Sequence, residues 1–205
     1  MEASVSVRVY YDFASSISYV AHRVMERMAG ELAALAVDLE WVPLDLTQIT
    51  GWPRGAPIEG YRRENSLRVA RELGVEVRLA GQWPDSRSAN AVALALAGTR
   101  QAPAWRERVY SALHEEGRSL DDPGMVEALG RDMGISAAEL ADDRGLAALE
   151  AESSLARRAN VTGVPTFLLG EWPIGGIQEE AVMRSLLERW AAKARLGFSA
   201  DVVGR

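Results

Sequence analysis

Hydrophobic and polar residues alternate near the start of the chain, from Val5 to Phe13. A period of two over this length predicts a β-strand with one face toward a core. Apolar residues then recur at helical spacing from Val20 to Leu35, after a serine-rich segment suited to capping a helix. A second alternating run, Val37 to Pro43, predicts another strand. The order strand–helix–strand favours a parallel pair joined by a right-handed crossover.

The chain leaves this pattern at a segment rich in glycine and proline, Gly51 to Pro57. Helical patterns dominate from there to residue 144, and a further helix is expected from Gly145 to Ala159. Short strands are then expected at Thr166–Leu169 and Trp172–Ile174, because a Gly-Glu turn separates two apolar runs. An amphipathic helix from Glu179 to Ala194 completes the pattern.

The complete order is β-α-β, a helical block, and then α-β-β-α. This order predicts an α/β protein with a thioredoxin-like fold whose two halves are separated by an α-helical insertion. We expect residues 1–50 and 145–197 to form a discontinuous thioredoxin-like domain. Residues 51–144 are expected to form the inserted helical subdomain.

The chain of 205 residues contains no cysteine and carries a net charge of −6. The missing thiols exclude disulfides, thiolate nucleophiles, CxxC redox chemistry and cysteine-based zinc sites. The acidic charge argues against nucleic acid as a partner, and no apolar run is long enough to span a bilayer. The first residues lack the pattern of a signal peptide. We therefore expect a cytoplasmic protein that acts on a small molecule, with no metal and no nucleotide.

Two histidines and an arginine pair are further candidates for chemistry. His22 and His114 are far apart in the sequence, which argues against a histidine-rich metal site. His22 follows Ser18 by four residues, but the chain has no nucleophile-elbow motif, so we interpret His22 as a solvated side chain. Arg62 and Arg63 are most simply interpreted as part of a solvated helix face.

Three segments resemble the DsbA superfamily of thioredoxin-like proteins. Residues 10–19, Tyr-Tyr-Asp-Phe-Ala-Ser-Ser-Ile-Ser-Tyr, resemble the strand-to-helix segment of 2-hydroxychromene-2-carboxylate isomerases and kappa-class glutathione transferases. Residues 61–74 resemble the start of their helical insertion. Gly163 to Phe167 is similar to the Gly-Val-Pro-Thr segment of the superfamily, whose proline is cis. The superfamily also includes DsbA and FrnE-type oxidoreductases.

The resemblance implies roles for residues at the start of the first helix. Ser15 and Ser18 stand where redox members carry two cysteines, and a serine pair cannot exchange disulfides. The isomerase and kappa branches also place a serine at position 15, and bound glutathione provides their thiol. By this resemblance Ser15 is catalytic, and glutathione is bound by Ser15, Ser18, Val164 and Pro165. The alternatives are that Ser15 is only an N-cap and that Pro165 only shapes the end of a strand.

The resemblance also implies a substrate pocket that includes Trp52, Tyr61 and Asp85, although Asp85 is equally suited to capping a helix. Two family features differ in this chain. The lysine expected three residues before Tyr61 is Ile58. Residues 175–180 contain two glutamates instead of an Asp-Arg pair, and these carboxylates would repel those of glutathione.

Two functions therefore remain open at the level of sequence. The first is a glutathione-dependent isomerase or transferase that uses Ser15 in place of a dithiol. The second is a DsbA or FrnE-type homologue without redox activity that binds a peptide or a small molecule. Ser15 favours the first function, and the two missing family features favour the second. The fold analogy also suggests a homodimer.

Overall fold

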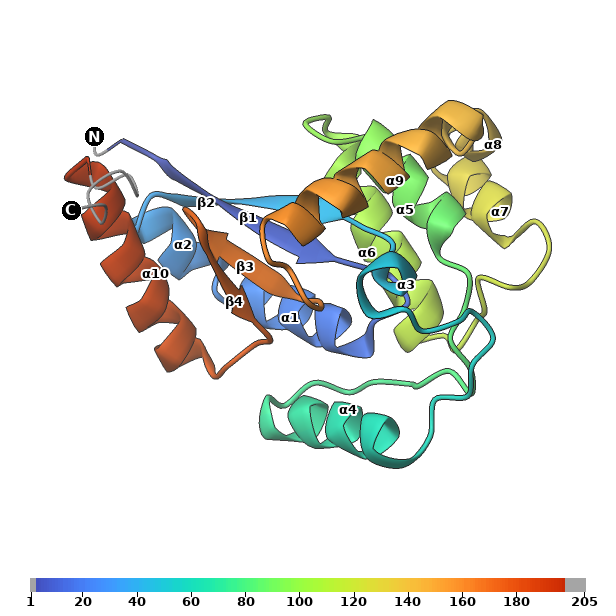
Figure 1. Ribbon diagram of the computed structural model, residues 1–205, viewed down its shortest axis with the longest axis horizontal. Coiled ribbons are helices and arrows are strands. Elements are labelled where there is room, and N and C mark those ends of the chain that lie inside the picture. Colours follow the sequence, from blue (N-terminus) through green and yellow to red (C-terminus); the bar gives the residue numbers. More distant parts are fainter. Residues whose placement is uncertain (1–2, 198–205) are drawn as a thin grey trace.

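The computed structural model describes residues 3–197 and contains a four-stranded mixed sheet (Figure 1). The strands are β1 (Val5–Tyr11), β2 (Val37–Pro43), β3 (Thr166–Leu169) and β4 (Trp172–Gly175). Their order is β2-β1-β3-β4, in which β1 and β2 are parallel and the other two pairings are antiparallel. This topology confirms the α/β class and is the one that the predicted thioredoxin-like fold requires.

Ten helices lie within residues 3–197. They are α1 (Ser16–Arg27), α2 (Ala29–Ala34), α3 (Leu46–Thr50), α4 (Gly60–Glu72), α5 (Arg87–Ala95), α6 (Gln101–His114), α7 (Met125–Asp132), α8 (Ala137–Leu140), α9 (Asp143–Arg158) and α10 (Glu180–Arg195). The helix predicted over 20–35 is in fact two helices that meet at Met28. The sequence pattern also missed α3, because five residues are too few to show a helical period.

The sheet is covered on both faces, as Figure 1 shows. Val7, Val9 and Phe167 are completely buried in one apolar cluster with residues of α1 and α10. Tyr10 points to the opposite face, where it shares a second cluster with Ala156 of α9. Alternate residues of β1 therefore enter different cores, as the period of two predicts.

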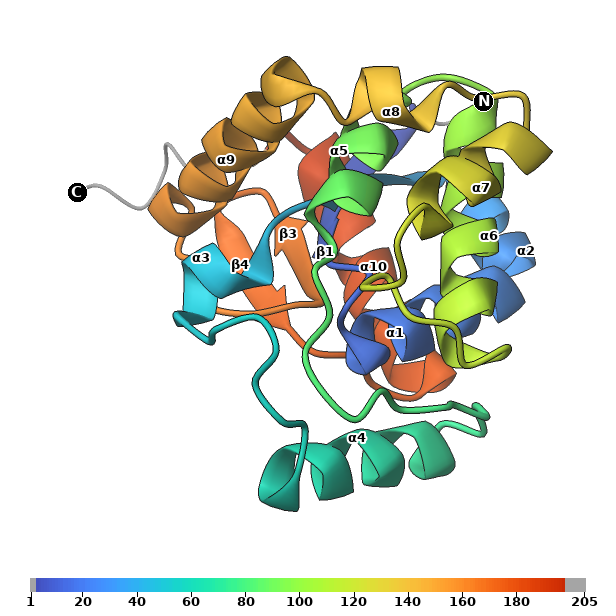
Figure 2. The same cartoon turned by 90° about the vertical axis from the view of Figure 1, so that its right-hand side faces the viewer.

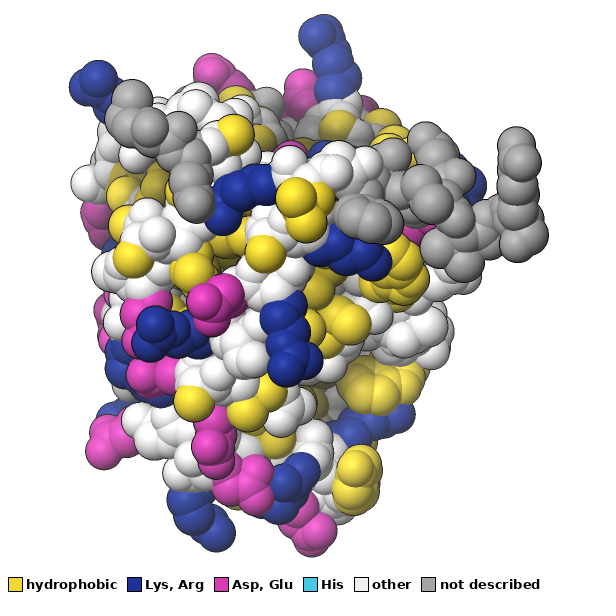
Figure 3. All heavy atoms as spheres, turned by 90° about the vertical axis from the view of Figure 1, so that its left-hand side faces the viewer, with side chains coloured by type: hydrophobic (Ala, Val, Ile, Leu, Met, Phe, Trp, Pro, Cys, Tyr) yellow, Lys and Arg dark blue, Asp and Glu magenta, His cyan; other side chains and the backbone are white. Residues whose placement is uncertain are grey.

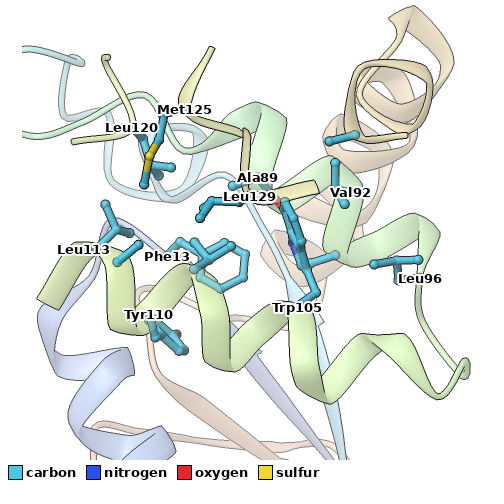
Figure 4. Close-up of a cluster of buried hydrophobic side chains, with 14 of the residues drawn as sticks. Phe13, Ala89, Val92, Leu96, Trp105, Tyr110, Leu113, Leu120, Met125 and Leu129 are labelled. Carbon is cyan, nitrogen blue, oxygen red and sulfur yellow. The ribbon is translucent and has the colours of Figure 1, made fainter. Parts of the chain in front are cut away.

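The inserted helices α5 to α8 surround a third apolar cluster, shown in Figure 4. Trp105 is fully buried there and donates its indole N–H to the carbonyl oxygen of Ala89 at 3.1 Å. Phe13, which follows β1, packs edge-to-face against Tyr110 of α6 with ring centres 5.0 Å apart. The inserted helices and the end of β1 therefore share one core.

Helix α4 lies apart from the other inserted helices, beside α1 (Figures 1 and 2). Two long segments without helix, residues 51–59 and 73–86, connect it to the rest of the chain. The hydroxyl of Ser16 at the start of α1 donates to the hydroxyl of Ser66 in α4 at 3.0 Å. This contact holds α4 against the N-terminal end of α1.

The prediction that His22 is solvated is wrong. Its side chain is only 4% exposed, because α6 covers a second face of α1. The imidazole stacks on the ring of Tyr110 at 5.2 Å, and Nε2 lies 3.0 Å from a carboxylate oxygen of Glu107. The sequence pattern shows one apolar stripe on this helix, and it cannot show that an inserted helix buries the polar face as well.

The outer surface carries interspersed charges. On the face drawn in Figure 3, basic and acidic side chains alternate with small hydrophobic areas. Trp172 of β4 keeps 41% of its surface exposed, and the ammonium group of Lys193 lies 4.4 Å from the centre of its ring. None of the helices within residues 3–197 combines the length and the apolar character that crossing a membrane demands.

Candidate functional site

The tight turn between β1 and α1 places Ser15 at the N-terminus of α1. Ser15 has an extended backbone (φ −87°, ψ 110°), and its hydroxyl oxygen accepts the N–H of Ser18 at 3.2 Å. This is the N-cap geometry predicted from the serine-rich segment. The hydroxyl makes no other hydrogen bond within residues 3–197, so its hydrogen remains available as a donor beside the positive end of the helix dipole.

Asp12 holds this turn from inside the protein. Its side chain is fully buried, and its oxygens accept the backbone N–H groups of Ala14 at 2.9 Å and Leu46 at 2.8 Å. They also accept the hydroxyl of Ser86 at 2.6 Å and the amide of Asn90 at 3.0 Å. Burial raises the pKa of Asp12 above its ordinary value, and these hydrogen bonds act in the opposite direction.

His114 of α6 and Asn90 of α5 fix the backbone of Phe13 in the same turn. Nε2 of His114 lies 3.2 Å from the carbonyl oxygen of Phe13, and the amide oxygen of Asn90 accepts the N–H of Phe13 at 3.4 Å. Burial lowers the pKa of His114 to about 4, so this imidazole is neutral at physiological pH. Both helices belong to the insertion, which therefore orients the turn that carries Ser15.

The loop before β3 faces this turn from the other half of the fold. The Val164–Pro165 peptide bond is cis, as predicted from the Gly-Val-Pro-Thr segment. Thr166 donates its hydroxyl to the carbonyl oxygen of Gly163 at 2.7 Å, which closes the loop. The N–H and C=O groups of Val164 make no hydrogen bond within residues 3–197, so both are open to a bound molecule.

A cavity of about 620 Å³ opens between the Ser15 turn, the loop around Val164, α4 and its two connecting segments. Its volume lies within the range of pockets that bind cofactors and drug-sized molecules. Much of the wall is apolar, with a few hydroxyl and amide groups between the apolar side chains. The apolar lining includes Phe13, Ile17, Leu46, Trp52, Ile58, Trp83, Leu113 and Val164.

Arginines provide all the formal charge in the wall of this cavity. Arg62, Arg78 and Arg118 line it, and no aspartate or glutamate of residues 3–197 does. Arg62 lies over the ring of Trp52, and Arg118 is 3.8 Å from a carboxylate oxygen of Glu116 outside the wall. Arg62 is exposed, as its interpretation as part of a solvated helix face predicts, and it also lines the cavity. The lining favours an anionic ligand with an apolar part.

The structure brings together some of the predicted site residues. Ser15 and Val164 line the cavity, and so do the predicted pocket residues Trp52 and Tyr61, of which Tyr61 is 79% exposed at the outer edge. Ile58, the residue in place of the family lysine, is also in the wall.

Three other predicted site residues do not line the cavity. Ser18 is completely buried under α6, beside Tyr110. Pro165 follows Val164 in the chain but does not line the cavity. Asp85 lies just before Ser86, the N-cap of α5. Its carboxylate accepts the N–H of Arg87 at 3.1 Å and pairs with the guanidinium groups of Arg87 and Arg54.

The expected repulsion by the glutamates of residues 175–180 is also not supported by the geometry. Glu179 and Glu180 are not part of the cavity wall. Glu180 accepts a hydrogen bond from Arg27 at 2.6 Å, on the outside of α1. The carboxylates of Glu179 and Glu180 therefore lie outside the wall of the cavity.

A cluster of His22, Glu26 and Glu107 has ligand atoms within 4.8 Å of one another. The guanidinium group of Arg23 already occupies the space between the carboxylates, donating to Glu26 at 2.6 Å and to Glu107 at 2.8 and 2.9 Å. Hydrogen bonding to His22 and the contact with Arg23 lower the pKa of Glu107 to about 2, against the opposing effect of burial. This arrangement is an ion-pair network between α1 and α6.

Sequence reasoning missed Asp12, Asn90, His114, Arg78 and Arg118. Asp12 offered one signal, because a charged residue directly after a buried strand requires hydrogen-bond partners. The others offered none, since they lie on separate helices and loops and become neighbours only after folding.

The sequence of this chain is similar to those of known proteins. The sequence profile described as DSBA-like thioredoxin domain matches residues 6–188. The uncharacterized protein YwbO of Bacillus subtilis (strain 168) is 23% identical over 188 residues, which cover 84% of this chain and 90% of that protein.

Several solved structures share the fold. A 2-hydroxychromene-2-carboxylate isomerase superposes with a TM-score of 0.73 at 19% identity, over 98% of this chain and all of that chain. The cytosolic disulfide reductase DsbM from Pseudomonas aeruginosa, solved with GSH, has a TM-score of 0.63 at 20% identity, over 94% and 98% of the two chains. A probable DsbA oxidoreductase from Streptomyces coelicolor has a TM-score of 0.69 at 17% identity, over 94% and 90%. At these identities the likeness concerns the fold.

Proposed function

Because this chain belongs to the family of DsbA-like thioredoxin domains, we propose that it is a glutathione-dependent isomerase or transferase that works without a cysteine of its own. The observation that carries the proposal is the cavity beside Ser15, where every charged wall residue within residues 3–197 is an arginine. Glutathione carries two carboxylates and an ionisable thiol, so a wall of this charge suits it. The isomerase and the GSH-bound reductase named above share the fold and motivate the choice of ligand.

The residues present fit such a ligand in three respects. The hydroxyl hydrogen of Ser15 is free to donate to a thiolate at the N-terminus of α1. The open N–H and C=O groups of Val164 can pair with an extended peptide, as an added strand would. Arg62 stands on α4 one turn before Ser66, which contacts Ser16, so its positive charge is close to the same end of α1.

Glutathione would supply the nucleophilic thiol that the chain itself lacks. Ser15 would stabilise the thiolate by donating a hydrogen bond, and the dipole of α1 would stabilise it further. Both effects lower the pKa of a thiol from about 8.5. Val164 would hold the peptide in an extended form. The apolar wall around Trp52 and Leu113 would exclude water and accept an apolar second substrate.

A second candidate function is that of a binding protein without catalysis, and one observation favours it. Among the described residues, no carboxylate lines the cavity, and the one histidine in its wall, His114, is neutral with both ring nitrogens facing carbonyl oxygens. No side chain there is suited to move a proton near neutral pH. Any catalysis would then depend on the thiol of the ligand alone.

Binding of glutathione by calorimetry and thermal shift tests the proposal. Glutathione at 100 times its dissociation constant stabilises a folded protein by about 2.7 kcal/mol. We expect an analogue with a methyl group in place of the thiol to bind more weakly, because it offers Ser15 no thiolate. The Ser15→Ala variant should remove this preference, while Ser88→Ala on α5 should retain it. Absence of any shift with glutathione would exclude the proposal, and equal binding of the two ligands would favour the binding protein.

We also propose that the protein works in the cytoplasm, where the GSH-bound relative is described as acting. Fractionation of cells that express the tagged chain would test this location.

A further inference from the structure

The buried carboxylate of Asp12 is not used by the proposed reaction and requires a separate explanation. Asp12 is fully buried, and no arginine, lysine or histidine of residues 3–197 pairs with it. Asp45, which is also buried, differs because Arg54 pairs with it. Burying a carboxylate without a countercharge costs free energy unless hydrogen-bond donors surround it. The environment of Asp12 meets that condition.

The donors to Asp12 come from three separate segments of the chain. Ala14 belongs to the turn that leads into α1, and its N–H donates to Oδ1 at 2.9 Å. Leu46 is the first residue of α3, and its N–H donates to Oδ2 at 2.8 Å. Ser86 directly precedes α5, and its hydroxyl donates to Oδ1 at 2.6 Å. Each of the two oxygens therefore anchors at least one distant segment.

These three segments also form different parts of the cavity wall. Ser15 follows the first segment and Leu46 itself lines the cavity. Trp83 and Pro84, which lie three and two residues before Ser86, line it beside the third segment. Asp12 is not in the wall, so a bound molecule does not touch it. Its carboxylate is hydrogen-bonded to all three segments.

We infer that Asp12 is a positioning residue of the candidate site, whose carboxylate fixes the Ser15 hydroxyl and the first turn of α1 relative to the walls that begin at Leu46 and Ser86. The inference rests on the proposed function for its chemical consequence, which is that a thiolate at Ser15 meets correctly oriented donors. The positioning itself is independent of which ligand binds.

Hydrogen exchange of the Asp12→Asn variant tests the positioning directly. The asparagine keeps the size of the side chain but replaces one acceptor oxygen with an N–H₂ donor, so at least one of the surrounding donors loses its partner. We expect amide exchange to accelerate about tenfold or more around Ala14 and around Leu46 at the same time. Asp38→Asn on β2, which removes an exposed carboxylate, should change neither segment. Equal exchange in the variant and the wild type would overturn the inference.

A thiol introduced by Ser15→Cys reports whether the positioning matters for the chemistry. Removing the negative charge of Asp12 would by itself lower the pKa of this thiol, whereas loss of oriented donors raises it. We expect Asp12→Asn to raise the thiol pKa, measured by the pH dependence of alkylation, with at least tenfold less thiolate at neutral pH. A fall or no change would overturn the role of Asp12 in the site. If Asp12 contributes only to folding, Asp12→Asn will lower the unfolding midpoint and leave the pKa of the introduced thiol unchanged.

The outcomes separate this inference from the proposed function. An ordinary thiol pKa of about 8.5 in the Ser15→Cys protein with Asp12 intact would exclude the anion site at Ser15. Hydrogen exchange would still decide whether Asp12 positions the segments. If Asp12→Asn does not fold, Ser86→Ala is the second variant. It removes the 2.6 Å hydrogen bond to Asp12 and the 3.2 Å hydrogen bond that Ser86 accepts from Asn90, and it should move both measurements in the same direction by a smaller amount.

Discussion

The guanidinium carbon of Arg62 lies 3.3 Å from the centre of the Trp52 ring. Trp52 in turn packs edge-to-face against Trp83 at 5.6 Å, so the arginine is supported by two aromatic side chains of the cavity wall. No carboxylate within residues 3–197 forms an ion pair with Arg62. The structure thus holds a positive charge at the cavity without neutralising it, which leaves that charge available to an anionic ligand.

Replacing Arg62 with glutamine should weaken glutathione binding. The loss of a cation at the cavity wall should raise the dissociation constant about tenfold, which corresponds to about 1.4 kcal/mol. Arg63→Gln is the matched control, because Arg63 is the next residue, has the same side chain and does not line the cavity. Titration calorimetry at low and high salt measures both variants. Equal affinities of the two variants would show that Arg62 does not recognise the ligand.

Ser15→Ala should reduce turnover far more than it reduces stability. Loss of an N-cap costs about 0.5–2 kcal/mol of folding free energy. Loss of a donor to an anion lowers a rate by about 10²–10³. The assay is conjugation of glutathione to a chlorodinitrobenzene probe, together with denaturant unfolding. Ser18→Ala should affect the rate much less, because Ser18 is buried away from the cavity. A fully active Ser15→Ala protein would remove Ser15 from the mechanism.

Glu107→Gln should lower stability near neutral pH and lose its effect in acid. The pKa of Glu107 is lowered to about 2 in the folded protein from an ordinary value of 4.5, chiefly by its hydrogen bond to His22. A lowered pKa means that the stabilisation is complete above about pH 4.5 and disappears as the pH falls toward 2. Urea unfolding at several pH values measures the difference between variant and wild type. A difference in unfolding free energy that stays constant from pH 7 to pH 3 would contradict this account. Glu188→Gln, which changes an exposed residue of α10, is the control.

Trp105→Phe should destabilise the protein by about 1–3 kcal/mol, since the carbonyl oxygen of Ala89 loses its buried donor. The new side chain is also smaller, so part of the space in the core of the insertion is left unfilled. Trp172→Phe provides the comparison, because that ring is partly exposed on β4. We expect the second variant to lose less than about 1 kcal/mol in the same unfolding experiment. Similar losses would mean that the core around Trp105 contributes little.

Much of the fold could be predicted because its signals are local. The alternation from Val5 predicted β1, and the apolar spacing after Glu179 predicted α10. Gly74, with a φ of +63°, follows the C-terminal end of α4, and a glycine in this left-handed conformation is a common local signal for the end of a helix. The break at Met28 was not predicted, because the apolar stripe continues across it into α2.

The candidate site could be predicted only in part. Ser15 and Val164 were found because each lies in a short segment that resembles a known family. Asp85 was placed in the pocket by the same resemblance, but it pairs with arginines on the surface beside α5. A resemblance transfers the position of a residue along the chain, and the packing around that position determines where its side chain goes.

The sequence by itself determined the strands, most of the helices, the N-cap at Ser15 and the exclusion of thiol chemistry, since each follows from residue type and short-range spacing. Only the tertiary structure decided what surrounds Ser15. Asp12 meets Asn90 across 78 positions of sequence, and Phe13 meets His114 across 101. The charge of the cavity depends likewise on Arg62, Arg78 and Arg118, which three separate segments bring to one wall. Such contacts form because burial of the shared apolar core draws distant segments together, and no local pattern records which polar groups then become neighbours.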